Sequence, residues 1–350
     1  MWPISPGDNA LHDVDFDTAA FGRWLAEQTG QEADLAIEPV RGGASCELFH
    51  MTRLGARWII RRAPKVAVAS SAHDVLREAR IIRALHGSAV QVPAVLASSD
   101  DAALLGAPFF IMEYIDGEVL RRGLPQDYLD HPEVQPAIGE QLVDRLADLH
   151  AFEWKHSAIA ELARPDGFLE RQVERWMGQL AKYRTRELPG VDDVARWLTD
   201  QLPPGGDLAV MHGDYKLDNV IFSRNAPPRI LSLLDFEMTT VGDPLVDLAW
   251  AMIFWPQEGN LIAFPAVGVP GGFDAAFCQK PEQLVRRYAE RTGRDMRHFQ
   301  WYQAFSAWKL AIVLEGSYAK YLGGESKNPT HKYLGFTIDQ LLARAQRFAV

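Results

Sequence analysis

The chain has few cysteines, no excess of basic charge and no long hydrophobic run. Its two cysteines, Cys46 and Cys278, lie far apart and form no C-x-x-C pair. A disulfide framework or a zinc site is therefore not expected, and a reducing compartment is predicted. The apolar run at residues 248–255 is too short to span a bilayer. The N-terminal residues lack the charged and apolar segments of a signal peptide, so we expect a soluble cytoplasmic protein without membrane insertion.

The balance of charge is acidic. The chain has 46 Asp and Glu residues against 36 Lys and Arg, and its formal net charge is −10. Basic patches are the usual footprint of nucleic-acid binding, so nucleic acid is not expected as a partner. No obligate protein partner is inferred either. A hydrophobic fraction of 47% is typical of a packed globular protein, and 350 residues favour two domains or lobes.

The first third of the chain reads as a small sheet with helices. A helix is predicted at residues 16–29 because its apolar residues recur at helical spacing and Gly30 follows it. A second helix is predicted from Ser71 and Asp74, read as a capping box, to His86. Strands are predicted at residues 35–40, 45–54, 57–62, 93–97 and 108–115. Three strands, a helix and two strands suit an antiparallel sheet with one helix laid on it.

The rest of the chain is mostly helical, so the predicted fold class is α+β. Helices are predicted at 138–152, 164–183, 191–202, 281–291, 296–321 and 333–348, with another starting at Asp243-Pro244 and a long loop at 256–278. The change of character follows Asp116-Gly117. We therefore expect two units, residues 1–115 for nucleotide binding and residues 116–350 for the catalytic loop, metal site and acceptor pocket.

A stretch of polar residues between apolar strands, from Val210 to Asp247, organises the sequence. It reads HGDYKLDN at 212–219, and Asp235 follows the next strand. Hard cations such as Mg²⁺ prefer oxygen ligands and take only one or two carboxylates from a protein, which fits these residues. The spacing also fits H-x-D-x-x-x-x-N, the pattern of a phosphoryl-transfer loop.

Four other segments surround this motif in order: RGGASCELF (41–49), REARIIRAL (77–85), FFIMEYIDG (109–117) and LDFEMTTVGDPLVDLAW (234–250). Together the five segments resemble the aminoglycoside phosphotransferase and choline kinase superfamily, and in particular the phosphotransferase-like domains fused to acyl-CoA dehydrogenases. The resemblance implies a protein-kinase-like two-lobe fold, with an antiparallel sheet plus helix in the N-lobe and a mostly helical C-lobe. It also implies ATP and Mg²⁺ as cofactors and a small molecule as acceptor.

The resemblance assigns the chemistry to four residues. Asp214 takes the position of the catalytic base, which orients the acceptor hydroxyl and accepts its proton. Lys216 takes the position of a lysine that neutralises the γ-phosphate. Asn219 and Asp235 are the expected metal ligands. Glu237, which follows in place of the glycine of protein kinases, is left open between a metal contact and a pair with a nearby base.

The segment RWIIRR at residues 57–62 is expected to supply a cation for the α- and β-phosphates. Strand alternation places Arg61 on one face and Arg62 on the other. The kinase pattern V-A-I-K puts its lysine where Arg61 falls, and Arg62 remains the competitor. Glu78 lies on the apolar face of its predicted helix, where a carboxylate needs a partner, so we expect it to hold Arg61.

Two segments of the first unit are predicted to bind the nucleotide. The turn at 41–45 would cover the phosphates with backbone N–H groups and a hydroxyl, and the segment 112–115 resembles a kinase hinge for adenine. The assigned residues are Gly42, Gly43 and Ser45 in the turn, and Met112, Glu113 and Ile115 in the hinge-like segment. An ordinary hairpin turn and an ordinary strand end remain the alternatives.

Four polar residues of the motif are assigned to support. His212 is expected to brace the loop, Asp218 to stabilise it, and Asp243 to cap a helix. Asp247 resembles the helix aspartate that binds the backbone amides of the catalytic loop.

The predicted function is an ATP-dependent transfer of the γ-phosphate to a small-molecule hydroxyl, on a hydroxyacyl thioester or a lipid-like alcohol. Eight positions from Asp235 to Asp243 leave no room for the activation segment of a regulated protein kinase. One alternative is an aminoglycoside or choline-type kinase, which would need converging acids. The available acids are Glu170, Glu174, Asp192 and Asp193. The other alternative is a nucleotide-binding pseudoenzyme scaffold. In the predicted helix around residues 301–318, Lys309 and Glu315 are candidate acceptor contacts.

Overall fold

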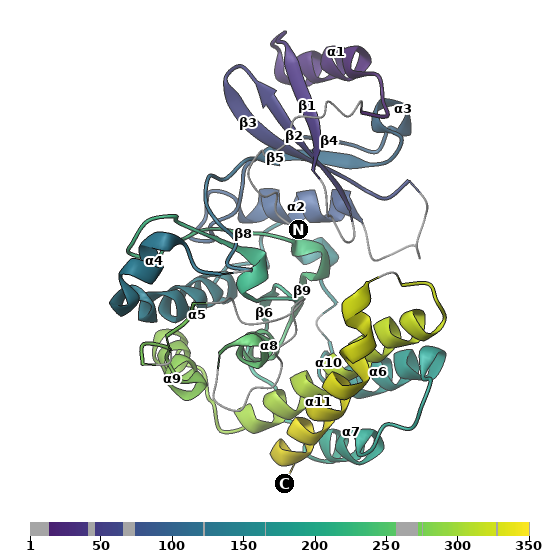
Figure 1. Cartoon of the computed structure of the whole chain (residues 1–350), viewed down its shortest axis with the longest axis vertical. Helices are drawn as coiled ribbons and strands as arrows, with labels where there is room; N and C mark the ends of the chain where they lie inside the picture. Colours follow the sequence, from purple (N-terminus) through teal and green to yellow (C-terminus); the bar gives the residue numbers. More distant parts are fainter. Residues whose placement is uncertain are drawn as a thin grey trace.

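A computed structural model shows two lobes, one built on a sheet and the other on helices (Figure 1). The structure describes residues 14–40, 46–65, 74–121, 123–164, 166–256, 272–274, 276–326 and 328–349. The sheet lobe comes first in the chain and the helical lobe second, as predicted. The expected limit between residues 115 and 116 stays a prediction.

The N-terminal lobe contains a five-stranded sheet in the order β1-β2-β3-β5-β4, and every neighbouring pair is antiparallel. Its strands are β1 (Leu35–Val40), β2 (Glu47–Arg53), β3 (Ala56–Arg62), β4 (Val95–Ser99) and β5 (Phe109–Glu113). The predicted sheet is therefore confirmed, with strand ends that shift by one or two residues. The short helix α3 (Ala102–Leu105) between β4 and β5 was not predicted.

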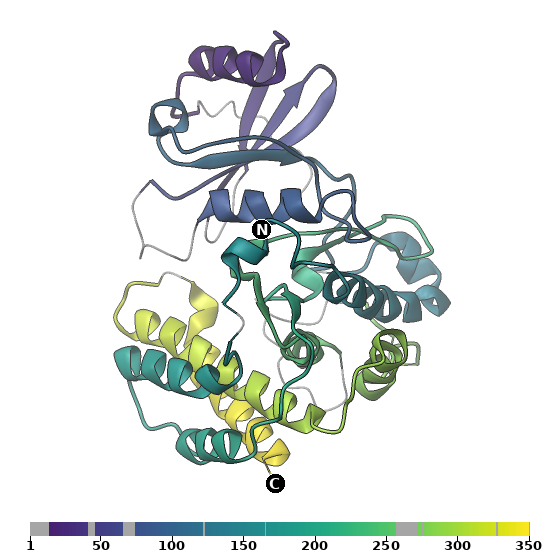
Figure 2. The ribbon, with the colours of Figure 1, turned by 180° about the vertical axis from the view of Figure 1, so that it is seen from behind.

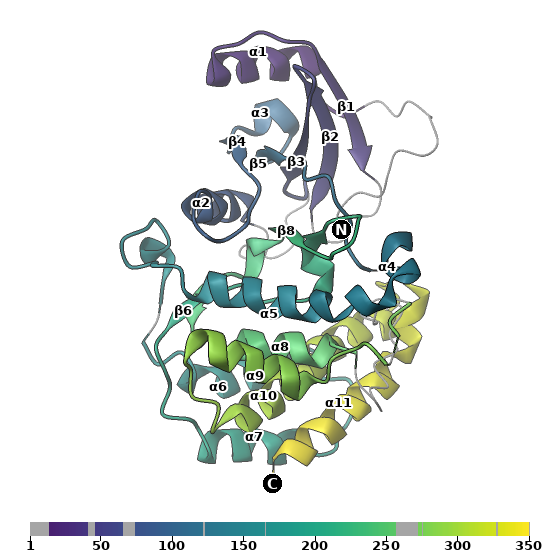
Figure 3. The same cartoon turned by 90° about the vertical axis from the view of Figure 1, so that its left-hand side faces the viewer.

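The two faces of the sheet pack against different helices. Because side chains alternate along a strand, Phe109 and Ile111 of β5 belong to a core under α1 (Thr18–Thr29). Phe110 and Met112 belong instead to the core that continues into the C-terminal lobe. The helix α2 (Val75–Leu85) lies on this inner side, between the sheet and the helical lobe (Figure 3).

The start of α2 differs from its prediction. Asp74 is the N-cap, and its side chain accepts a hydrogen bond from Arg77 N at 2.9 Å. The predicted capping box, with Ser71 at its first position, is therefore wrong, because Asp74 itself occupies the N-cap position. Ser71 lies outside the described residues. The apolar face is buried as expected, and Glu78 is buried within it.

The C-terminal lobe packs its helices around α8 and α10, which are largely buried (Figure 2). The helices are α4 (Gln126–Asp130), α5 (Pro136–His150), α6 (Glu170–Tyr183), α7 (Val191–Asp200), α8 (Leu245–Phe254), α9 (Pro281–Thr292), α10 (Phe299–Leu322) and α11 (Leu334–Phe348). Two short antiparallel pairs carry the polar motif: β6 (Ala209–Met211) with β9 (Thr240–Gly242), and β7 (Val220–Phe222) with β8 (Ile230–Leu233). The predicted helices are present. The helix α6 begins six residues later than predicted, after Gly167 at φ +58°.

The chain passes from the sheet to the helical lobe after β5. Glu118 and Phe222 exchange two backbone hydrogen bonds of 2.8 Å, which attach this connection to β7. A Cβ at Gly117 would collide with the Ile221 side chain and the Phe222 carbonyl, so the close approach requires glycine there. Among the described residues, no helix is long and apolar enough to cross a membrane.

Candidate active site

A cleft between the sheet and the helical lobe brings together residues that are far apart in the sequence. Its lining includes Arg61, Glu78, Met112, Asn219 and Asp235. Glu113 and Ile115 are not part of this lining, and the Glu113 N–H already donates to Ala94 O at 2.8 Å. The Glu113 N–H is therefore occupied, which leaves the Glu113 carbonyl for the predicted adenine contact with the backbone at Glu113. The contact at Ile115 stays a prediction. Gly42, Gly43 and Ser45 lie outside the described residues.

The backbone of the catalytic loop is held by Asp247 of α8. Its carboxylate accepts the amide of His212 at 2.5 Å and that of Gly213 at 3.0 Å. Gly213 has φ +86°, and a Cβ there would collide with the carbonyl of Met238. Only glycine combines this conformation with this close approach, so the loop and the segment after Asp235 are fixed against each other. The predicted supporting role of Asp247 is confirmed.

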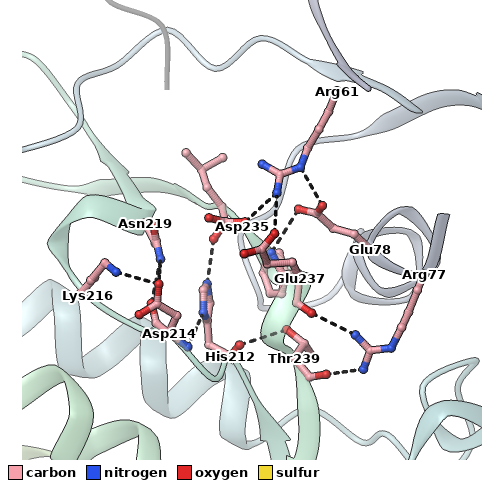
Figure 4. A network of polar contacts seen from close by, with 12 residues as sticks. Arg61, Arg77, Glu78, His212, Asp214, Lys216, Asn219, Asp235, Glu237 and Thr239 are labelled. Carbon is pink, nitrogen blue, oxygen red and sulfur yellow. Dashed lines mark hydrogen bonds and ion pairs between the residues drawn. The ribbon is translucent and has the colours of Figure 1, made fainter. Parts of the chain in front are cut away.

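Both carboxylate oxygens of Asp214 have partners, and Figure 4 shows two of them, Lys216 and Asn219. Its Oδ2 accepts from Lys216 Nζ at 2.7 Å and Asn219 Nδ2 at 3.1 Å, and its Oδ1 accepts from Trp250 Nε1 at 2.9 Å. Burial is the largest influence on the pKa of Asp214 and raises it. The charge and hydrogen bond of Lys216, with the bond from Trp250, outweigh burial and hold the pKa below its usual value. Asp214 is therefore an ionised, oriented carboxylate at neutral pH.

Asn219 and Asp235 offer oxygen atoms at the same cleft. The Asn219 amide nitrogen donates both to the Asp214 carbonyl, at 2.8 Å, and to its carboxylate, which leaves the amide oxygen as the atom turned away from Asp214. Asp235, two residues after the end of β8, adopts a left-handed conformation with φ 65° and ψ 63°. A non-glycine residue in this region is strained, and such strain is often found at functional sites.

The oxygen atoms of Asn219 and Asp235 fit Mg²⁺ better than they fit a metal ion whose ligands all come from the protein. Within the described parts of the chain, no cluster of three or more His, Cys, Asp or Glu residues could hold a metal ion. One carboxylate and one amide oxygen are the limited set that Mg²⁺ takes when phosphates and water complete its shell. The donor chemistry of Asn219 and Asp235 therefore matches the predicted cation.

Arg61 joins the sheet to the acids of the cleft. Its guanidinium lies 2.8 Å from Glu78, 2.8 Å from Asp235 and 3.4 Å from Glu237 (Figure 4). Burial lowers the pKa of Arg61, but these acids more than offset it, so the pKa is raised and the side chain stays charged. Burial raises the pKa of Glu78, and the charge of Arg61 opposes that rise.

The neighbouring Arg62 points to the other side of the sheet. It pairs with Asp15 at 2.8 Å and Glu47 at 2.8 Å, and it donates to Leu105 O at 2.7 Å. The strand alternation explains this division, because successive side chains leave a strand on opposite faces. The structure therefore places Arg61, and not Arg62, at the cleft.

Two residues at the cleft were not assigned from the sequence. Arg77 of α2 donates to the carbonyls of Glu237 and Thr239, and so binds α2 to the segment after Asp235. Trp250 binds Asp214 directly. Helical spacing could have found Trp250, because it follows Asp247 by three residues and therefore lies on the same face of α8.

The remaining support residues lie where predicted. His212 is fully buried, and its Nε2 lies 2.8 Å from the carbonyl of Leu234. Asp218 pairs with Arg121 at 3.4 Å. Asp243 accepts from the amide of Leu245, the first residue of α8, at 3.0 Å. The helix begins one residue later than predicted, and Pro244 takes the N-cap position predicted for Asp243.

The acids named for a cationic acceptor do not form a cluster. Glu170 and Glu174 are exposed on α6, whereas Asp192 and Asp193 of α7 lie near Arg184, at 3.9 Å, and Arg196, at 3.2 Å. Glu315 of α10 is fully buried and accepts from the Thr185 hydroxyl at 2.6 Å, so it is a core residue. The proposed acceptor contact of Glu315 is therefore wrong.

Comparisons with known proteins agree with this geometry. The profile of the phosphotransferase enzyme family matches residues 36–299. The chain is 30% identical over 310 residues to acyl-CoA dehydrogenase family member 11 of Gallus gallus, covering 85% of this chain and 38% of that relative. It thus spans well under half of the relative's length.

Solved structures show the same fold. A protein from Ralstonia eutropha, named as a candidate aminoglycoside phosphotransferase, is 26% identical with a TM-score of 0.81, and the match covers 95% of this chain and 98% of that one. Choline kinase from Cryptosporidium parvum is 12% identical with a TM-score of 0.62, over 95% and 96% of the two chains. The second likeness concerns the fold alone. The predicted kinase-like fold is confirmed.

Proposed function

This chain belongs to the phosphotransferase enzyme family, and we propose that it transfers the γ-phosphate of ATP to a hydroxyl of a small molecule. One observation carries the proposal. Asn219, Asp235 and the Arg61–Glu78 pair line one cleft, and Asp214 is hydrogen-bonded to Asn219 there. Together they are the set of groups that phosphoryl transfer requires.

Asp214 is the proposed base. The acceptor hydroxyl donates to its carboxylate, the hydroxyl oxygen attacks the γ-phosphorus in line, and the proton passes to Asp214 as the bond to the leaving ADP breaks. A carboxylate with a lowered pKa is a weak base. Its main contribution is therefore to orient the hydroxyl, and it accepts the proton late in the transfer.

The phosphates are proposed to lie against the cations of the cleft. Lys216 would neutralise the γ-phosphate, and Arg61 would contact the α- and β-phosphates while Glu78 holds it in place. Asn219 and Asp235 would hold Mg²⁺. When bound, this ion would neutralise the negative charge that the phosphates carry during the transfer. Met112 lines the part of the cleft proposed for adenine, with the carbonyl of Glu113 and the backbone of Ile115 beside it.

The proposed acceptor is a hydroxyacyl compound, such as a hydroxyacyl thioester, or a lipid-like alcohol. Similarity to a protein named as an acyl-CoA dehydrogenase family member supports an acyl group. The exposed or paired state of Asp192 and Asp193 gives no support to a cationic aminoglycoside or choline acceptor.

The test is transfer of radiolabelled γ-phosphate by the purified chain to a panel of hydroxyacyl thioesters, lipid-like alcohols, aminoglycosides and choline. We expect a labelled hydroxyacyl or alcohol product. Asp214→Asn should lower kcat by about 10²–10⁴-fold with ADP affinity unchanged, whereas Asp218→Asn, in the same loop, should lower it far less. Undiminished turnover in Asp214→Asn would contradict the mechanism. Nucleotide binding without product across the panel would favour a scaffold.

A further inference from the structure

A buried lysine lies beside Asp214 without a carboxylate partner among the described residues. Lys309, in the middle of α10, is 9% exposed. Its Nζ lies 4.4 Å from the centroid of the Trp250 ring and 5.3 Å from that of Trp176. Trp250 belongs to α8 and Trp176 to α6, which both pack against α10 (Figure 1). Three helices therefore converge on one ammonium group.

The two indoles do not complete the hydrogen bonding of this group. A ring face attracts a cation but offers no oxygen, whereas an ammonium group has three donors. The indole N–H of Trp176 is also buried and finds no acceptor among the described residues. Leaving a buried donor without an acceptor costs free energy, and the Lys309 ammonium has no hydrogen bond to any of the described residues. The two groups together therefore indicate a place for an oxygen-bearing ligand.

A second lysine lies on the same aromatic side of α8 as Lys309. Lys216 lies over the ring of Phe254 at 5.6 Å, and Phe254 packs edge-to-face on Trp250. The aromatic side of α8 therefore has a lysine at each end. Burial is the main reason that the pKa of Lys309 is lowered to about 8; Asp247 and Asp214 oppose this shift, and Arg175 adds to it. Asp247 is already bound to the amides of the catalytic loop, and Asp214 has three donors of its own.

We propose that Lys309, together with the indole N–H of Trp176, binds an anionic group of the acceptor, a carboxylate or a phosphate, while the acceptor hydroxyl lies at Asp214. This inference rests on the proposed phosphotransferase function and names the acceptor class. The N–H of Trp250 holds Asp214 and its ring face holds Lys309, so the hydroxyl and the anionic group lie on two sides of one indole. A cationic amino alcohol would meet a like charge at Lys309.

Calorimetry on the whole chain, saturated with ADP and Mg²⁺, tests this directly. The probes are ω-hydroxycarboxylates of four to ten carbons, their methyl esters, hydroxyalkyl phosphates and amino alcohols of matching length. We expect the best carboxylate or phosphate probe to bind about 10-fold or more tightly than the neutral ester, the scale of one charge-assisted hydrogen bond. Comparison of the carboxylate and phosphate series identifies which anion the site takes.

The variant Lys309→Met should lose this preference and bind the ester as wild type does. Lys309→Arg keeps the charge and should keep the preference, and Trp176→Phe should weaken the anionic probe only. Lys320→Met, an exposed lysine on the same helix, is the matched control and should change nothing. If Lys309→Met misfolds, as judged by ADP affinity and thermal unfolding, Lys309→Arg and Trp176→Phe are compared with the wild type instead.

Preference of the wild type for the ester or the amino alcohol would overturn the inference, as would an undiminished anion preference in the Lys309 and Trp176 variants. The assay needs no turnover, so it separates two failures. Anion-selective binding without phosphate transfer to any probe would refute the proposed function alone. Phosphate transfer to amino alcohols without anion selectivity would refute the acceptor class alone.

Discussion

Trp250 donates its indole N–H to Oδ1 of Asp214 across 2.9 Å, from a helix that also holds the catalytic loop through Asp247. The other carboxylate oxygen, Oδ2, is occupied by Lys216 and Asn219. The carboxylate is therefore held at both ends before any substrate arrives. Such fixed geometry matters because a small displacement of a catalytic group costs a large factor in rate.

Replacing Trp250 with Phe should remove this hydrogen bond and keep the ring under Lys309. We expect kcat to fall about 10–100-fold, the equivalent of one hydrogen bond to a charged group, with the KM for ATP unchanged. The bond also helps to lower the pKa of Asp214, so the acid limb of kcat should move to higher pH. Trp301→Phe, which loses an indole bond to Leu198 O, is the control. An unchanged kcat in Trp250→Phe would exclude an orienting role.

Variants of the two adjacent arginines of β3 should change different properties, ADP affinity for one and the free energy of unfolding for the other. Arg61→Lys loses the forked contact to Glu78 and Asp235, and ADP affinity should fall about 10-fold. Arg62→Lys loses contacts on the opposite face and should lower the free energy of unfolding by about 1–3 kcal/mol with ADP affinity unchanged. Calorimetry and chemical denaturation measure the two quantities. Equal losses of ADP affinity in both variants would contradict the assignment of Arg61.

Gly213 should not tolerate a side chain. Alanine at φ +86° is strained, and its Cβ would collide with the Met238 carbonyl. We expect Gly213→Ala to lower the free energy of unfolding by about 2–4 kcal/mol and to abolish turnover, because the loop bearing Asp214 must move away from the segment after Asp235. Gly206→Ala, where a Cβ meets open space, should be neutral or stabilising. Denaturation curves of the two variants that coincide would disprove this account.

Lys309 should reduce stability in a pH-dependent way. Its pKa is about 8 in the folded chain and near 10.5 in the unfolded one, so the unfolded chain binds more protons between these values and stability rises with pH there. Lys309→Met should therefore be more stable than wild type below pH 8, by about 1–3 kcal/mol. The difference should shrink as pH approaches 10.5. Lys320→Met should show no such trend, and a constant difference for Lys309→Met would contradict the burial of a charge.

The local periodicity of the sequence was sufficient to predict which side chains of β3 and α2 face the cleft. Strand alternation separated Arg61 from Arg62, and helical spacing put Glu78 on the buried face of α2. These are properties of a few neighbouring residues, and the pairing of β3 with β5 then fixes where the faces point. The short helices α3 and α4 carry too few residues for any periodicity to appear, and neither was predicted.

The acceptor side depends on contacts that no local pattern encodes. Trp176, Trp250 and Lys309 come from three helices whose relative rotation is set by packing in the C-terminal lobe. Lys309 was named as a candidate acceptor contact, but Trp176 and Trp250 read as ordinary helix residues in the sequence. Glu315 shows the reverse error: its place in the predicted helix around residues 301–318 suggested a pocket residue, and its partners Thr185 and Arg186 make it part of the core.

The contacts of the cleft fall into two sets that respond differently to motion of the lobes. Arg61 with Asp235, and Arg77 with the carbonyl of Thr239, cross from one lobe to the other. Asp214 and its partners lie in the helical lobe alone. Since the Glu118–Phe222 bridge attaches the connection to the helical lobe, we expect a rotation that opens the cleft to turn at residues before Glu118 and to break the crossing contacts. The residence time of a nucleotide is then expected to depend on the crossing side chains, and the rate of phosphate transfer on those of the helical lobe.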